Sequence, residues 1–452
     1  MGIQTARIFF VLFVISTGIV LFTLSRRNLS QSISWTAFSG KFKHRDGDSK
    51  ITVLDNKGNS TPSPAVSPTT THKAKITDSV TTNPVTEFKT DVMRTSTHGA
   101  VAETPMPVLF KSSFKKLPKW DFEDKYNQDA PPRQTTCAQS LRKSEDESFK
   151  KAFLPNIRLF MHKDNINMSE WNRLSHFNNP FGFMGYKYDD VMASAKLISK
   201  PKEPLLLPVP GSDGCVRCAV VATSGILYGS KLGKEIDAHD YVFRMNGAVI
   251  KGFEEDVGNK TSVYVHTAHS ITSASYTLKK YGYKSVPHDE GIKYVMIPEG
   301  MRDFQWLQGL LKGERVSAGP YRNKRPRTYY AQQYNETRFY VLHQDFLRYV
   351  RNRFLSSHIL NSVHWGIVRP TNGAFTLFLA LQTCDIVDAY GFITGDHKKY
   401  SNYYYQRNAK THVVYYINHD YTVEMNMWKK LHNSKIIRLY QRTDPETEKP
   451  KQ

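Results

Sequence analysis

The chain has 452 residues, of which 62 are Lys or Arg and 41 are Asp or Glu, so its formal net charge is +21 at pH 7. This length exceeds one typical domain, but the first quarter is too polar to supply part of a packed core, so one large domain behind a tail is expected. The charge suits anionic partners such as acidic membranes or phosphorylated ligands. No motif that combines aromatic and basic residues accompanies it, which argues against nucleic-acid binding.

The first predicted element is a membrane anchor. Residues 8–24 (IFFVLFVISTGIVLFTL) carry no charge, and as a helix they would span roughly 25 Å at about 1.5 Å per residue. A cleaved signal peptide is the alternative, but the apolar run is long for one and no small-residue cleavage site follows it. We therefore expect a cytoplasmic tail over residues 1–7 and an uncleaved anchor over residues 8–24.

Residues 25–130 are rich in Ser, Thr, Pro and Lys and show no sustained hydrophobic period. Such a segment cannot bury enough apolar surface to offset its ordering entropy, so an extended, glycosylated stem is expected. Five N-glycosylation sequons favour a lumenal location for the body of the chain: Asn28, Asn59, Asn167, Asn259 and Asn335. Asn28 is too close to the expected membrane surface to be used, which leaves four predicted sites.

The four cysteines all lie beyond the stem, at Cys137, Cys215, Cys218 and Cys384. In an oxidising lumen two disulfides are expected, and spacing alone leaves three possible connectivities. The Cys215-x-x-Cys218 pair could instead indicate a redox motif or half of a zinc site. A zinc site needs a second ligand pair at comparable spacing, and Cys137 and Cys384 stand alone, so structural disulfides are favoured.

Residues 131–452 alternate short apolar runs with helical patterns, which predicts an α/β domain. Strands are expected at residues 218–221, 241–244, 294–297, 386–390 and 413–417. Helices are expected at residues 345–355, 374–382 and 423–432. The alternation predicts a mostly parallel, Rossmann-like sheet with helices on both faces, in which ligands bind beyond the carboxyl ends of the strands.

The stretch from residue 218 to 248 is the first that indicates chemistry, since it reads as strand, glycine-containing turn, helix and second strand. Thr223, Ser224 and Gly225 would lie where the first strand meets the helix, and free N–H groups and the helix dipole at such a place favour a phosphate. The turn is not a P-loop, because the Gly-Lys-Ser/Thr ending is missing. Spacing alone favours a simpler role, a tight turn in which Ser224 caps the helix.

Residues 218–261 resemble the large sialylmotif of the animal sialyltransferases, and residues 369–393 resemble the small sialylmotif. The sequence YYYQ at residues 403–406 matches the third motif, and His419 followed by Glu424 matches the very small motif, His-x4-Glu. Four motifs in the family's order form a specific signal. Within the family, the sequences IDAHDYVFRMNGAVIKGFEEDVG and IIRLYQR are most similar to the subgroup that adds sialic acid in α2,6 linkage to O-linked GalNAc.

This resemblance implies a variant GT-A-type glycosyltransferase fold and an inverting transfer of N-acetylneuraminic acid from CMP-sialic acid to O6 of GalNAc on mucin-type glycoproteins. It implies no metal and no other cofactor. It also implies a single-pass type II protein of the Golgi membrane whose catalytic domain is lumenal. Two alternatives stay open: an enzyme with another acceptor, such as galactose in α2,3 linkage, and a catalytically impaired homologue that binds glycans.

The resemblance assigns donor binding to residues of both long motifs: Thr223, Ser224, Gly225, Asn246, Thr371, Asn372 and Gly373. The simpler role for Asn246 is that of a left-handed turn residue before Gly247. Two positions depart from the family pattern, since Ala222-Thr223 replaces the usual Gly-Asn and Asn372 replaces a small hydroxyl residue. These departures leave open a weaker donor site or an inactive relative.

For catalysis, the resemblance implies that His419 is the general base, and an imidazole pKa near 6.5 would suit a mildly acidic Golgi lumen. Glu424 would orient His419 or stabilise its charged form, or else would only interact with the dipole of the following helix. Tyr403 would donate to the departing phosphate. The implied disulfides are Cys137–Cys215 and Cys218–Cys384.

Overall fold

The computed structural model describes residues 103–442, except residues 203, 408 and 410. The predicted tail, the predicted anchor, most of the stem, and the sequons at Asn28 and Asn59 lie outside the described residues. Within the described residues, no helix combines the length and the apolar character needed to cross a membrane.

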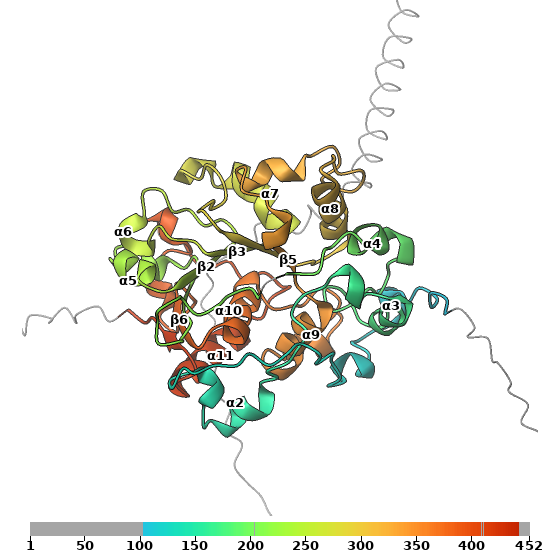
Figure 1. The fold of residues 1–452 in the computed structure, drawn as a ribbon, viewed down its shortest axis with the longest axis horizontal. Helices are drawn as coiled ribbons and strands as arrows, with labels where there is room; N and C mark the ends of the chain where they lie inside the picture. The colour runs from blue at the N-terminus through green and yellow to red at the C-terminus, as the bar shows by residue number, and fades with distance from the viewer. Residues whose placement is uncertain (1–102, 203, 408, 410, 443–452) are drawn as a thin grey trace, which may run out of the picture. The chain divides into compact units, whose positions relative to one another are not determined.

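The described residues are built on a seven-stranded sheet in which every neighbouring pair of strands is parallel and the spatial order is β5-β4-β3-β2-β1-β6-β7 (Figure 1). In the centre of the sheet, Ala219 is in register with Val242 on one side and with Asp388 on the other. The strands are β1 (Arg217–Val221), β2 (Tyr241–Met245), β3 (Val263–His266), β4 (Lys293–Met296), β5 (Phe339–Val341), β6 (Ile386–Tyr390) and β7 (Arg438–Leu439).

Helices cover both faces of this sheet. In Figure 1, α7 and α8 lie on one side, and α9, α10 and α11 lie on the other. The described α-helices are α2 (Glu147–Ala152), α3 (Met168–Leu174), α4 (Tyr188–Ala195), α5 (Gly233–Asp237), α6 (Glu254–Val257), α7 (Ala268–Thr277), α8 (Met301–Lys312), α9 (Gln344–Arg353), α10 (Asn372–Thr383) and α11 (Tyr421–Asn433). The predicted parallel α/β sheet with helices on both faces is therefore confirmed for the described residues.

The central strands and α10 form the core because their sequences are mostly apolar. All four residues of β3 (VYVH) are buried, as expected for a parallel strand that is covered on both faces. In α10, every residue from Ala374 to Thr383 is buried. A helix that is apolar all round belongs in the interior, so α10 lies against the sheet and is covered in turn by neighbouring helices.

Four of the five predicted strands are confirmed as β1, β2, β4 and β6, and the three predicted helices are confirmed as α9, α10 and α11. The predicted strand at residues 413–417 is wrong. Its side chains from Val414 to Ile417 are exposed in a loop. The place beside β6 is taken by β7, so this β-branched and aromatic segment has no strand to pair with there.

The packed structure begins before the predicted boundary at residue 131. Leu117, Asp121 and Tyr126 are all buried, although the predicted stem includes them. The Arg351 guanidinium donates to Asp121 Oδ1 at 2.7 Å and so attaches this segment to α9. Polar composition alone did not reveal these few buried anchors, so the predicted start of the domain was too late.

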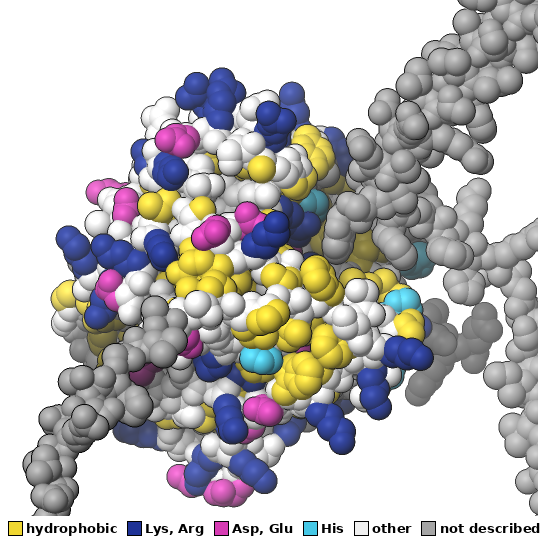
Figure 2. All heavy atoms as spheres, turned by 90° about the vertical axis from the view of Figure 1, so that its right-hand side faces the viewer, with side chains coloured by type: hydrophobic (Ala, Val, Ile, Leu, Met, Phe, Trp, Pro, Cys, Tyr) yellow, Lys and Arg dark blue, Asp and Glu magenta, His cyan; other side chains and the backbone are white. Residues whose placement is uncertain are grey.

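The three sequon asparagines within the described residues, Asn167, Asn259 and Asn335, are all exposed. Figure 2 shows one face of the molecule, on which basic side chains are scattered among apolar and acidic ones and do not merge into one continuous patch. Glycan attachment at the three asparagines stays a prediction, and exposure is the condition it requires.

Candidate active site

The sheet changes its direction of winding between β1 and β6. From β1 the chain adds β2 to β5 along one side and then returns to place β6 on the other side of β1. In open parallel sheets such a switch point creates a crevice at the carboxyl ends of the two strands. At that edge, the N–H of Ser224 donates to the carbonyl of Gly391 at 2.9 Å. The predicted donor turn Thr223-Ser224-Gly225 therefore lies at the switch point.

Gly225 permits a close approach between the large motif and the third motif. A Cβ atom at this position would lie 2.0 Å from the backbone oxygen of Ser401, so a larger residue would force the backbone to move. The N–H of Tyr404 donates to the carbonyl of Thr223 at 3.1 Å. The third motif is thus held directly against the predicted donor turn.

The helix expected after this turn is shorter than predicted. Ser224 caps a 3-10 helix of only three residues, Gly225–Leu227, by accepting from the N–H of Ile226. The capping role of Ser224 is confirmed. A helix dipole accumulates along the axis, so this short turn provides individual N–H and hydroxyl groups for an anion but very little dipole.

Asn246 and Asn372 bring the large and small motifs together. Asn246 follows β2 with φ of 55°, so its interpretation as a left-handed turn residue is confirmed. Asn372 begins α10, and its amide Nδ2 donates to Asn246 Oδ1 at 2.8 Å. The bond uses the carbonyl oxygen of Asn246 and leaves its amide hydrogens to donate to a ligand. It also explains the departure at position 372, because a small hydroxyl side chain would not reach as far as an amide.

Thr371 makes hydrogen bonds within the protein that join two helices. Its N–H and its hydroxyl donate to the two carboxylate oxygens of Glu424, each at 2.7 Å. Its hydroxyl oxygen also accepts from the N–H of Ala374 and caps α10, while Gly373 lies in the first turn of that helix. Both donors of Thr371 are used within the protein, so the expectation that Thr371 donates to the nucleotide needs correction.

Glu424 does not hold His419 as expected. Its carboxylate accepts from Thr371, so it joins α11 to the N-terminus of α10. Burial raises the pKa of the Glu424 carboxyl to about 7, against the hydrogen bonds from Thr371. The very small motif and the small motif are therefore locked together by a carboxyl group that readily takes up a proton.

Glu424→Gln should change how stability depends on pH. Because the pKa of about 7 in the folded protein lies above the ordinary glutamate value of 4.5, the stability that Glu424 contributes is fully present below pH 4.5 and is lost as pH rises through 7. The free energy of unfolding is measured by chemical denaturation at pH 5 and at pH 8. Between these two pH values it should fall by on the order of 2 kcal/mol more in the wild type than in the variant. The exposed Glu290→Gln is the matched control, and equal pH dependence in all three proteins would contradict the assignment.

His419 is held by the backbone of the small motif. Its Nδ1 lies 2.8 Å from the carbonyl oxygen of Arg369. A carbonyl oxygen can only accept, so Nδ1 carries the hydrogen and Nε2 keeps a lone pair. The amide Nδ2 of Asn418 lies 3.2 Å from Nε2. This tautomer is the one that a general base requires, with Nε2 as the atom that takes the proton.

The pKa of the His419 imidazole is lower than expected. Burial, together with the positive charge of Arg369, lowers the pKa of the imidazole to about 4. The ring of Tyr421 packs edge-on against it, with 5.9 Å between ring centroids. His419 is therefore neutral across the mildly acidic range, and it is a weaker base than the predicted value near 6.5 implied.

Tyr403 lies beside the donor turn, where it pairs with Ser224 as an antiparallel bridge. Its ring stacks on that of Tyr405 with 5.0 Å between centroids. Burial raises the pKa of the Tyr403 phenol, so the hydroxyl stays protonated and can donate a hydrogen bond. The position agrees with the predicted role toward a phosphate at the turn, and the role itself stays a prediction.

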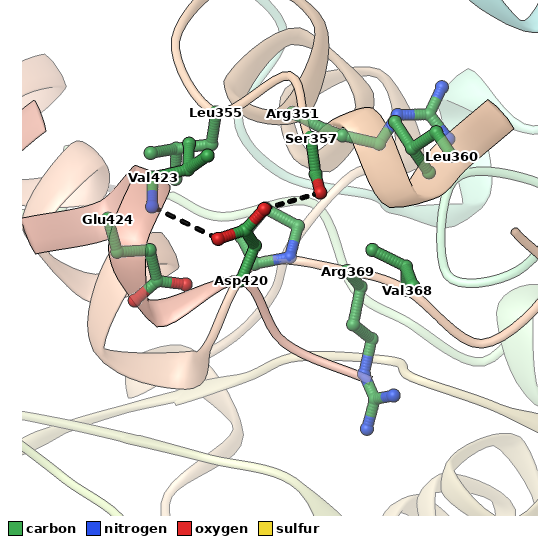
Figure 3. Close-up of a pocket in the computed structure, with 10 residues that line it drawn as sticks. Arg351, Leu355, Ser357, Leu360, Val368, Arg369, Asp420, Val423 and Glu424 are labelled. Atoms are coloured by element: carbon green, nitrogen blue, oxygen red, sulfur yellow. Dashed lines mark hydrogen bonds between the residues drawn. The ribbon is translucent and has the colours of Figure 1, made fainter. Parts of the chain in front are cut away.

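A small cavity lies behind the very small motif (Figure 3). Its free volume of ≈ 10 Å³ is room for about one water molecule, too little for a nucleotide. Asp420 spans it, with Oδ2 accepting from the Ser357 hydroxyl at 2.6 Å and Oδ1 accepting from the N–H of Val423 at 3.1 Å. The cavity therefore belongs to the support of the α11 N-terminus and not to the donor crevice.

One group of metal-ligand type residues occurs among the described residues, formed by Glu170, His343 and Asp345. The guanidinium of Arg173 donates to both Glu170 and Asp345 at 2.7 Å. The guanidinium of Arg173 already balances the charge of the two carboxylates. We therefore interpret this cluster as a structural ion-pair network at the start of α9.

The two disulfides have the implied connectivity. Cys137 is bonded to Cys215, and Cys218 is bonded to Cys384. The second bond joins β1 to the C-terminal end of α10, the two elements whose opposite ends carry the donor turn and Thr371. The redox and zinc alternatives for Cys215-x-x-Cys218 are wrong, because these two cysteines have different partners.

Hydrogen bonds thus connect all four motifs at the carboxyl edge of the sheet. The large motif is bonded to the third motif and to the small motif, and the small motif is bonded to the very small motif. A doubly wound α/β domain with a polar site at its switch point is the class of fold that binds nucleotide-type ligands. Residues 160–436, more than half of the chain, match the description "Glycosyltransferase family 29 (sialyltransferase)". The chain belongs to this family.

The chain is similar to human alpha-N-acetylgalactosaminide alpha-2,6-sialyltransferase 1, with 44% identity over 370 residues that cover 77% of this chain and 61% of the relative. It is 38% identical to mouse alpha-N-acetylgalactosaminide alpha-2,6-sialyltransferase 2, covering 67% of this chain and 82% of the relative. A crystal structure of a mammalian sialyltransferase in complex with Gal-beta-1-3GalNAc-ortho-nitrophenol matches 69% of this chain and 100% of that chain, with 23% identity and a TM-score of 0.49. The chain spans less than two thirds of the length of the human relative.

Proposed function

We propose that this chain transfers N-acetylneuraminic acid from CMP-sialic acid to O6 of GalNAc that is O-linked to Ser or Thr of mucin-type glycoproteins. The observation that carries this proposal is the tautomer of His419: the Arg369 carbonyl fixes Nδ1–H, so Nε2 is the proton-accepting atom of the ring. In this structure Nε2 accepts from the Asn418 amide at 3.2 Å, a bond that the acceptor hydroxyl would replace. Hydrogen bonds link this site to the other three family motifs. The acceptor assignment is supported by the names of the relatives with 44% and 38% identity.

In this mechanism, O6 of the acceptor attacks the anomeric carbon of the donor while the bond from that carbon to the phosphate oxygen breaks. The proton of O6 goes to Nε2 of His419, and the leaving electron pair goes to the phosphate of CMP. The Tyr403 hydroxyl donates to that phosphate. One displacement inverts the configuration, so the β-linked donor gives an α-sialoside.

A base with a pKa near 4 can perform this step. The transition state resembles an oxocarbenium ion, as in other glycosyl transfers. The acceptor oxygen gains positive character as it bonds to that centre, so its proton becomes strongly acidic late in the step. His419 needs to be neutral and correctly oriented more than strongly basic, and its tautomer and its lowered pKa provide both conditions.

Donor binding is assigned to neutral groups at the switch point: Thr223, Ser224, Gly225, Asn246, Asn372 and Gly373. Thr223 follows β1 and Asn246 follows β2 at the same carboxyl edge of the sheet. Their hydroxyl and amide groups are neutral donors of the kind that a phosphate and a ribose need. CMP departs as a stable anion that these groups can solvate. No metal or other cofactor enters this mechanism.

The cellular setting follows from the sequence. Residues 8–24 would anchor the chain as a type II protein in the Golgi membrane, with the stem and the catalytic domain in the lumen, where CMP-sialic acid and O-GalNAc glycoproteins would be its partners.

The test is a transfer assay with the detergent-solubilised full chain and CMP-sialic acid. We expect transfer to desialylated mucin at least tenfold faster than to lactose, and a product that an α2,3-specific sialidase leaves intact but a broad-specificity sialidase cleaves. Preference for lactose would favour the galactose α2,3 alternative. CMP binding without any transfer would support the impaired glycan-binding alternative.

A further inference from the structure

A buried carboxylate outside the four motifs is connected to His419 through one residue. Arg369 exchanges two hydrogen bonds with the segment that carries the base. Its N–H donates to the Asn418 carbonyl at 2.9 Å, and its carbonyl accepts from His419 Nδ1 at 2.8 Å. The side chain of Arg369 donates from Nε to Glu299 Oε1 at 3.1 Å. The backbone that fixes the imidazole is therefore held in place by Glu299.

Glu299 is well placed to hold Arg369. It follows β4 at the carboxyl edge of the sheet, and only 7% of its side chain is exposed. Its second oxygen, Oε2, accepts from Arg302 in the first turn of α8 at 2.9 Å. Figure 3 shows the Arg369 guanidinium pointing away from Asp420 and Glu424, the other carboxylates near this segment. The Arg369 side chain also donates from Nη1 to the Ile367 carbonyl at 3.3 Å, and Glu299 is the acidic side chain with which it forms an ion pair.

The charges that act on the imidazole come from two elements and have opposite signs. Arg369 lowers the pKa of His419, whereas Glu299 raises it. Burial acts to raise the pKa of Glu299, but Arg369, then Arg302, and least of all His419 lower it, so that the pKa falls to about 2. The ring also contacts Asn418, which is neutral, and Tyr421 from α11, whose pKa is raised by burial, so that its phenol is uncharged.

We propose that Glu299 is a positioning residue for His419. It holds Arg369 so that the Arg369 carbonyl fixes the Nδ1–H tautomer, and its negative charge offsets the Arg369 guanidinium beside the base. Without Glu299, the guanidinium would lose its Nε anchor and keep only its weaker bond from Nη1 to the Ile367 carbonyl at 3.3 Å, and the ring would face an uncompensated positive charge. This inference rests on the proposed function only in assigning the proton transfer to His419.

The experiment compares Glu299→Gln, Arg369→Gln and the double variant in the full chain. The histidine ring signals are followed by NMR against pH, and the His419 signal is assigned by its loss in His419→Gln. The pKa of His419 should fall in Glu299→Gln, rise in Arg369→Gln, and return toward the wild-type value in the double variant. The opposite signs follow from Coulomb's law and need no enzymatic activity.

Kinetics provide the second readout. Glu299→Gln should lower kcat by about tenfold, while KM for CMP-sialic acid changes less than twofold, because one part of the general-base contribution is lost and donor binding is not. Glu299→Asp, which keeps the charge, should recover most of the rate. The exposed Glu314→Gln should behave as wild type in both measurements.

Equal pKa values for His419 in Glu299→Gln and wild type would overturn the proposal, as would a loss of donor binding that parallels the loss of kcat. If Glu299→Gln fails to fold, two other variants still decide it. Arg369→Gln must raise the pKa of His419, and Glu299→Asp, which keeps the charge, must leave that pKa near the wild-type value; either result failing would overturn the proposal. Failure of the proposed function is distinguishable, because wild-type protein would then show no transfer while the NMR titration still reports the coupling.

Discussion

His419→Gln is expected to lower kcat by about 10²- to 10⁴-fold, the range that a positioned general base contributes. Glutamine keeps a polar side chain of similar reach, so it can still donate to the Arg369 carbonyl that holds Nδ1 at 2.8 Å. It has no group that takes up a proton at these pH values. Binding of CMP, measured by calorimetry, should stay within about threefold of wild type, since the donor groups belong to the large and small motifs.

The pH profile of the wild type provides an independent check of the same assignment. Because the pKa of His419 is lowered to about 4, kcat/KM should not fall on the acid side until pH approaches that value, and no decline centred near 6.5 is expected. His412→Gln, an exposed histidine of the preceding loop, is the matched control and should keep full activity. A variant at position 419 that loses CMP binding together with turnover would indicate a structural role for the ring.

The sequence predicted the central elements of the fold because their patterns are unambiguous. The mostly apolar runs in β1, β2, β4 and β6 and the mostly apolar helix α10 indicate burial. Two of the strands not predicted, β5 and β7, have only three and two residues, too few for periodicity to be recognised. β3 is as long as the predicted β4, and its apolar run was missed. The segment at residues 413–417 has the composition of a strand, and only the arrangement of the sheet shows that the position is already filled.

For the site, the structure brings residues of all four motifs to one edge of the sheet, and it gives some of them other contacts than the motifs predicted. Sequence spacing placed Glu424 one helical turn into α11, but it could not show that the carboxylate faces Thr371 and not His419. The low pKa of His419 depends on burial, which spacing does not report. Glu299 gave no signal at all, because it lies outside every motif and becomes relevant only when β4 and the small motif meet at one edge of the sheet.

Replacing Cys218 and Cys384 together with alanine is expected to have the largest effect on stability. This bond closes a separation of 166 residues, and chain-entropy reasoning gives about 5 kcal/mol for such a loop at 25 °C. Globular domains are stable by only about 5–15 kcal/mol. Denaturant titration should therefore show a loss of a third or more of the free energy of unfolding, with a melting temperature many degrees lower.

The bond between Cys137 and Cys215 is the matched control, since it closes 78 residues and is expected to contribute nearly as much, about 4.5 kcal/mol. The two double variants should differ at the site. Cys218–Cys384 fixes β1 against α10, whose other ends carry the turn at Thr223 and the Asn372 amide, so its loss should raise KM for CMP-sialic acid at temperatures where both variants are folded. Cys137–Cys215 lies before β1 and joins no site element, so its loss should leave KM within twofold of wild type. Equal KM values in the two variants would mean that packing alone, without the covalent link, holds the donor turn and α10 in register.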